Sequence, residues 1–155
     1  MNFYSKTVAV LAAATVIAFA ASAVEADPGR GEAAKLRKLE MMLMVGSLRC
    51  RFGADNFQAD YERFKLTHRG ALDSAYRQLR ADYARQLGAK EGELALDRLS
   101  VGFANTYGEK HPWLGCGELK VMTQDLASST DRTHLIAVAD YALAPGRIGT
   151  LASAR

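Results

Sequence analysis

The chain has 155 residues, of which 49% are hydrophobic and 24% are charged, and its formal net charge at pH 7 is +3. This composition is typical of one globular domain with a hydrophobic core of its own. The small positive excess is spread along the chain, which argues against a nucleic-acid-binding protein and against attachment to a membrane by charge alone.

Residues 1–26 have the layout of a secretory signal peptide. Lys6 precedes a mostly apolar run over 8–21, and small side chains follow at two places where a signal peptidase would cut, after Ala23 or after Ala26. The run is short for a permanent membrane anchor. We therefore expect an exported chain, periplasmic or secreted, with no membrane span once the signal is removed.

The two cysteines, Cys50 and Cys116, both lie in the region that would be exported. In an oxidising compartment a single pair indicates one disulfide. Loop-closure entropy gives a bond across this sequence distance roughly 4 kcal/mol of stability. Thiols that bind a metal or carry out redox chemistry are the alternative, although the chain contains no CxxC motif that would tune either thiol.

Residues 27–144 are predicted to form one all-α domain, a compact bundle of about five helices. The first helix is expected over about 32–51, ended by Gly53. Its apolar positions recur at steps of three and four, at Leu36, Leu39, Leu43, Gly46 and Cys50. This spacing forms one face of a helix and points Cys50 inward. Hairpin-turn dipeptides and alternating β-branched residues, the signals of strands, do not occur.

The clearest period in the chain predicts a single long helix between Asp55 as N-cap and Gly88 as C-terminal stop. Its inward positions follow one another at three or four residues: Phe57, Tyr61, Phe64, His68, Leu72, Ala75, Leu79, Tyr83 and Leu87. One phase runs through Gly70, which therefore marks at most a kink. On this stripe His68 is interpreted as a core histidine.

Acids and bases on the opposite face of the long helix are spaced for i+3 and i+4 pairing. Examples are Asp60 with Arg63 and Asp82 with Arg85. Such pairs stabilise an exposed helix surface by about 0.2–0.5 kcal/mol each. We interpret this face as solvated.

Three shorter helices complete the predicted bundle. They are expected over about 91–107, over about 116–128, and from a cap at Ser129 or Thr130 to a stop at Pro145. The disulfide would tie the end of the first helix to the start of the fourth. Residues 145–155 hold few large apolar side chains and are predicted to be a disordered tail.

The connector between the third and fourth helices is the best candidate for a site, with Asn105, Glu109, His111 and Trp113 close in sequence. One interpretation is a small binding cleft in which Trp113 offers a stacking surface and His111 gives or takes a proton. The other is structural: Trp113 fills the core, Pro112 fixes the turn, and Asn105 is a cap or turn residue. The residues favour the structural interpretation without excluding the first.

Motifs for cofactor chemistry are missing. The chain has no HExxH, no CxxCH, no GxSxG and no Gly-rich phosphate loop, so we expect no cofactor and no metal. A metal or haem site would have to be assembled in three dimensions from His68 or His111 with Met44. His134 is expected to face solvent.

Four blocks of the sequence carry a resemblance. They are MLMVGSLRCR at 42–51, DNFQADY at 55–61, ANTYG at 104–108 and HPWLGC at 111–116. In these blocks the chain resembles a group of small exported helical proteins from alphaproteobacteria, over about 36–143. Members of that group have no settled activity, and some carry the label S-adenosyl-L-homocysteine hydrolase.

That hydrolase is a large cytoplasmic α/β enzyme that holds NAD on a dinucleotide-binding domain. The present sequence has neither the strands nor the Gly-rich loop of such a domain. No catalytic residue is therefore carried over from the label.

Three functional hypotheses follow. The first is an exported, non-catalytic helical protein that binds an envelope protein or a small ligand near Trp113. The second is a small hydrolase-type enzyme with a site built from His111 and either Glu109 or Asn105. The third is metal or haem binding. A carboxylate within hydrogen-bond reach of His111 would favour the enzyme, and a packed connector would favour the binding protein.

Overall fold

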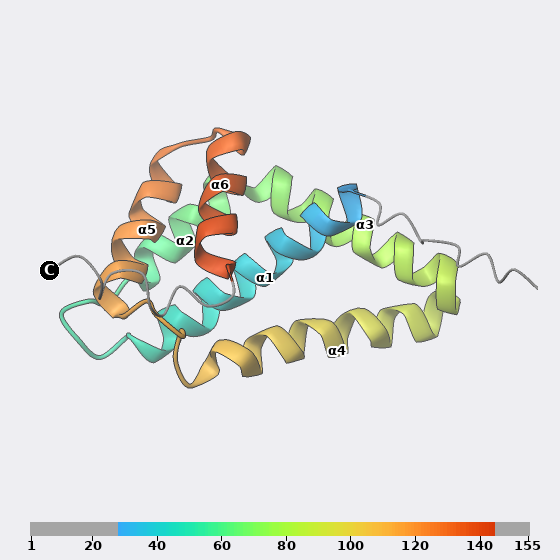
Figure 1. The fold of residues 1–155 in the computed structure, drawn as a ribbon, viewed down its shortest axis with the longest axis horizontal. Coiled ribbons are helices and arrows are strands. Elements are labelled where there is room, and N and C mark those ends of the chain that lie inside the picture. Colours follow the sequence, from blue (N-terminus) through green and yellow to red (C-terminus); the bar gives the residue numbers. More distant parts are fainter. Residues whose placement is uncertain (1–27, 145–155) are drawn as a thin grey trace, which may run out of the picture.

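The computed structural model describes residues 28–144, which form six α-helices and no β-strand (Figure 1). The helices are α1 (Pro28–Arg49), α2 (Gln58–Thr67), α3 (Arg69–Leu87), α4 (Ala89–Gly108), α5 (Cys116–Ser128) and α6 (Arg132–Leu143). The predicted all-α fold is confirmed. The predicted signal peptide at 1–26 and tail at 145–155 lie outside the described residues.

Helix α1 runs through the middle of the molecule and contacts all five other helices (Figure 1). The α3–α4 hairpin packs along one side of it, while α2, α5 and α6 gather on the other. The side chains of Leu36, Leu39, Met42 and Leu43 are at most 1% exposed. Because α1 is covered from several directions, apolar residues are buried around much of its circumference.

The long helix predicted between Asp55 and Gly88 is two helices. Gly88 ends the second with a positive φ of 84°, as predicted. Asp55 does not cap the first, because the residue before α2 is Phe57. The break falls at His68 (φ −103°, ψ 14°) and not at Gly70, where an added Cβ would meet nothing within 4 Å.

The break is held by hydrogen bonds to the end of α5. The His68 Nε2 lies 2.9 Å from the Leu126 carbonyl oxygen, and the Thr67 hydroxyl donates to the Ala127 carbonyl oxygen at 3.1 Å. The last carbonyls of a helix have no partner within that helix. Two side chains at the α2–α3 junction therefore cap α5, and His68 is the buried histidine that its position on the stripe predicted.

Two acids that we assigned to a solvated face are buried at helix contacts. Asp60 is 7% exposed and accepts a hydrogen bond from the Gln124 side chain of α5 at 3.2 Å. Asp82 is 3% exposed and lies 3.4 Å from the Nε of Arg30 on α1. The interpretation of that face as solvated is wrong at these positions, because α2 and α3 each pack against more than one helix.

At the start of α6 the cap differs from the prediction. Asp131 precedes the helix, and its carboxylate accepts the Thr133 N–H at 2.9 Å. Ser129 acts just before the cap, because its hydroxyl oxygen accepts the Asp131 N–H at 3.1 Å. No helix within residues 28–144 combines the length and apolar character needed to cross a membrane.

Within the α3–α4 hairpin, the backbones of the two helices come close to each other at Gly92. A Cβ added at Gly92 would lie 2.7 Å from the backbone nitrogen of Ala84 and 2.7 Å from the carbonyl carbon of Tyr83. Backbone atoms cannot move aside as a side chain can. Gly102, further along the same helix, has open space at the corresponding point.

Gly92→Ala should therefore destabilise the fold and Gly102→Ala should not. We expect the first to lower the free energy of unfolding by about 1–3 kcal/mol, the usual cost of overpacking. The matched control removes a helix-interior glycine without a clash, so it should raise stability by up to about 1 kcal/mol. Urea unfolding followed by circular dichroism measures both, and equal midpoints would contradict the close approach.

Candidate functional site

A disulfide fixes the candidate connector at one end. It joins Cys50, just after α1, to Cys116, the first residue of α5, across a Cα–Cα distance of 5.8 Å. The predicted pairing is confirmed, and within residues 28–144 no cysteine is left as a thiol. The bond brings the start of α5, and with it residues 109–115, against the end of α1.

His111 is buried, with 4% of its surface exposed, and both of its ring nitrogens are engaged. The Nδ1 accepts the backbone N–H groups of Trp113 (3.3 Å) and Leu114 (3.1 Å), and the Nε2 lies 2.9 Å from the Ala142 carbonyl oxygen. A carbonyl oxygen only accepts, so Nε2 carries the proton and Nδ1 carries none. The imidazole is therefore neutral, and both nitrogens are occupied by the fold.

The electrostatic surroundings keep that neutral form. Burial lowers the pKa of the His111 imidazole below its ordinary value, and the nearby Arg49 guanidinium adds to the lowering. The hydrogen bond to Ala142 and the Glu118 carboxylate act in the opposite direction but are smaller. Desolvation dominates because charging a buried ring would cost its hydration.

Aromatic rings pack on His111 from both neighbouring segments. The Tyr107 ring of α4 stacks on it with centroids 5.4 Å apart and planes at 18°, and the Trp113 indole meets it edge-on at 4.6 Å and 87°. Tyr107 is buried, which raises the pKa of its phenol. His111 and Leu114 of the connector are thus buried in the core, and Trp113 lies partly buried against it, whereas Glu109, Lys110, Pro112 and Gly115 are exposed.

Two buried donors near the connector have no acceptor within residues 28–144. They are the Nε of Arg49 and the indole Nε1 of Trp113. Another nitrogen of the Arg49 head group is engaged, since its Nη1 donates to the Glu109 carbonyl oxygen at 3.0 Å. A small molecule bound beside Trp113 would have to offer an acceptor to these donors.

The other predicted site residues are not assembled around His111. Asn105 is exposed inside α4, so it is not a helix cap, and the Glu109 side chain is exposed as well. The Glu118 carboxylate accepts the Gly115 N–H at 2.6 Å at the start of α5. Neither nitrogen of His111 is hydrogen-bonded to a carboxylate, the arrangement that would have favoured an enzyme.

The histidines named for a metal or haem site are also hydrogen-bonded within the fold. His68 and His111 each direct Nε2 to a backbone carbonyl oxygen. His134 pairs with the Asp125 carboxylate at 2.7 Å at the surface. Within the stretch of the chain that the structure describes, no three His, Cys, Asp or Glu side chains are grouped to hold a metal ion.

An apolar groove between α5 and α6 was not predicted from the sequence. It has a cavity volume of about 510 Å³ and is lined by Leu114, Gly117, Glu118, Val121, Met122, Asp125 and Tyr141. Val121 is 66% exposed and Tyr141 is 48% exposed. The signal that would have found the groove is Val121, an apolar residue that lies off the buried stripe of α5.

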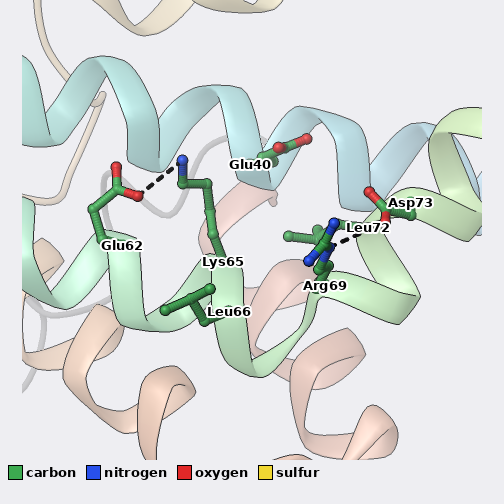
Figure 2. A pocket seen from close by; sticks show the side chains of 7 residues that line it. All are labelled: Glu40, Glu62, Lys65, Leu66, Arg69, Leu72 and Asp73. Atoms are coloured by element: carbon green, nitrogen blue, oxygen red, sulfur yellow. Dashed lines mark ion pairs between the residues drawn. The ribbon is translucent and has the colours of Figure 1, made fainter.

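A second depression, of about 230 Å³, lies where α2 meets α3, and it is lined mainly by charged side chains (Figure 2). Lys65 pairs with Glu62 at 3.0 Å, and Arg69 lies 3.7 Å from Asp73 (Figure 2). Glu40 above them is paired with Arg37 on its own helix at 2.8 Å. Because each of these charged side chains is already paired with a Lys, Arg or carboxylate group of opposite charge, this depression offers little to a charged ligand.

Comparisons with known proteins add no relative. No protein-family model matches the chain, and neither a curated protein nor a solved structure matches it. The resemblance to the group of small exported helical proteins stays a prediction.

Reduction of the disulfide should weaken the fold strongly. Opening a loop of this length removes about 4 kcal/mol of stability in the chain-entropy model. We expect urea unfolding of the native protein to shift to lower concentration when a reductant is added. The Cys50→Ala/Cys116→Ala variant is the control, because its unfolding should not respond to reductant. Free thiols in the native protein by mass spectrometry would contradict the bond.

Acidification should destabilise the protein through His111. Its stabilising contribution is complete above the ordinary imidazole pKa of 6.5 and is lost as the pH falls towards the lowered value in the fold. We therefore expect the free energy of unfolding to drop between about pH 7.5 and about pH 5 by more in the native protein than in His111→Gln. Urea unfolding at both pH values measures the difference, and parallel losses in the two proteins would refute it.

Proposed function

We propose that this protein is an exported, non-catalytic binding protein that docks a segment of an envelope protein in the α5–α6 groove. The observation that carries the proposal is the contrast between two neighbouring places. The groove presents exposed apolar side chains, whereas both ring nitrogens of His111, in the connector beside it, are engaged in hydrogen bonds that hold the fold.

The groove depends on the connector for its shape. Leu114 belongs to its lining, and the backbone N–H of Leu114 is held by the His111 Nδ1. The same imidazole bonds Ala142 near the end of α6, and α6 supplies Tyr141 to the groove. His111 thus acts as a positioning residue for a binding surface rather than as an acid or a base.

The form of the groove suits a protein segment better than a small molecule. Small-molecule sites enclose most of their ligand, but Val121 and Tyr141 stand about half or more exposed. The lining is apolar at Leu114, Val121 and Met122, with the carboxylates of Glu118 and Asp125 among them. An apolar segment flanked by basic residues complements this surface.

Export is supported by two observations of different kinds. The first is the predicted signal peptide at 1–26. The second is the Cys50–Cys116 disulfide, a bond that persists in oxidising compartments.

Site-specific photocrosslinking in intact cells tests the proposal. A benzophenone amino acid at Val121 should give a discrete adduct with an envelope protein, because this side chain lies in the groove. The matched control is the same amino acid at Val101, an exposed valine on α4 that is 49% accessible. A second change, Met122→Asp, should abolish the adduct formed from Val121.

Two results would contradict the proposal. The first is the same adducts from Val121 and Val101, which would show contact without a preferred surface. The second is a chain that stays in the cytoplasm and still begins at Met1, which would remove the proposed compartment. Gentle osmotic release of the periplasm and mass spectrometry of the released chain report on the second.

A further inference from the structure

The chain itself contains a segment with the chemistry that the α5–α6 groove would bind. Residues 145–155 read PGRIGTLASAR, with two large apolar residues, Ile148 and Leu151, and two bases, Arg147 and Arg155, but no acid. The groove combines an apolar lining with the Glu118 carboxylate, which accepts the Gly115 N–H, and the Asp125 carboxylate, which pairs with His134. The two are complementary both in charge and in apolar character.

Connectivity places the start of this segment beside the groove. Tyr141, in the last turn of α6, lines the groove, and α6 ends at Leu143. Ala144 has extended backbone angles (φ −59°, ψ 130°), which end the helix, and a proline follows it. The chain therefore leaves the helix only a few residues after contributing Tyr141 to the groove.

The segment is long enough to follow the groove. Helices α5 and α6 are antiparallel, because His134 at the start of α6 bonds Asp125 near the end of α5, and Ala142 bonds His111 just before α5. The groove residues of α5, from Gly117 to Asp125, extend about 12 Å at 1.5 Å per residue. An extended chain covers roughly 3.3 Å per residue, so a few residues of 145–155 are sufficient.

We infer that residues 145–155 occupy the α5–α6 groove of their own chain, with Ile148 and Leu151 against Val121 and Met122. A conformation with about three residues per turn puts both apolar side chains on one side. A tethered segment acts at an effective concentration on the order of mM, so modest affinity is sufficient for occupancy. This inference rests on the proposed function only in using the same groove, and it makes the segment a competitor of the partner.

Photocrosslinking in the purified full chain tests the contact directly. With the benzophenone amino acid at Val121, mass spectrometry of the monomer should find an intramolecular link to a peptide from 145–155. The same amino acid at Val101 should give no such link. A link from Val121 to another region of the chain, or covalent dimers in place of the intramolecular product, would overturn the inference.

Competition supplies an independent test with a labelled synthetic peptide of sequence PGRIGTLASAR as probe. The full chain with Ile148→Asp and Leu151→Asp should bind the peptide at least tenfold more tightly than the native chain, because its groove is vacated. The control Ala152→Asp/Ser153→Asp adds the same charge to the segment without removing a large apolar side chain, and should bind like the native chain. Adding Val121→Lys to the vacated chain should abolish binding.

Equal affinity of the native and vacated chains, or binding unaffected by Val121→Lys, would overturn the inference. Failure here is distinguishable from failure of the proposed function, because the two are measured on different samples. Purified protein reports on residues 145–155, whereas intact cells report on the envelope partner.

Discussion

One buried imidazole, that of His111, organises the end of the molecule that carries the α5–α6 groove. His111 takes two backbone N–H groups of the connector on Nδ1 and directs Nε2 to the Ala142 carbonyl oxygen. It thereby ties the segment before α5 to the end of α6, while the Cys50–Cys116 disulfide ties the same region to α1. Leaving a buried polar group without a hydrogen-bond partner costs free energy, so breaking the hydrogen bonds of His111 would destabilise the fold.

The same bonds are the reason for proposing a binding role rather than a catalytic one. An acid or base in catalysis needs a nitrogen that can reach the substrate, but both nitrogens of His111 are used within the fold and the ring is buried. The structural role of the connector is to position Leu114 and α6, which line the apolar groove together with α5. We therefore propose a binding role for that groove. In this proposal residues 145–155 of the same chain occupy the groove and compete with a partner for it.

Two helix ends in this fold are closed in the same way. His68 directs Nε2 to Leu126 near the end of α5, and His111 directs Nε2 to Ala142 near the end of α6. In each case a side chain far away in sequence satisfies a carbonyl that the helix itself leaves unpaired. The two histidines that invite a catalytic or metal-binding interpretation are therefore used as structural donors.

The sequence by itself determined the helical class and the inward positions of α1, because both follow from the local period of apolar residues. It also determined the stop at Gly88, because the backbone freedom of glycine acts locally. The pairing of Cys50 with Cys116 followed because two cysteines allow only one pair. Only the tertiary structure decided four other features. They are the break between α2 and α3 at His68, the burial of Asp60 and Asp82, the hydrogen bonds to both nitrogens of His111, and the groove beside Val121. Each of these depends on a residue distant in sequence or on the meeting of two helices, as for His68 with Leu126 at a separation of 58. A helical period records which face of a segment is apolar, but not which neighbour covers it.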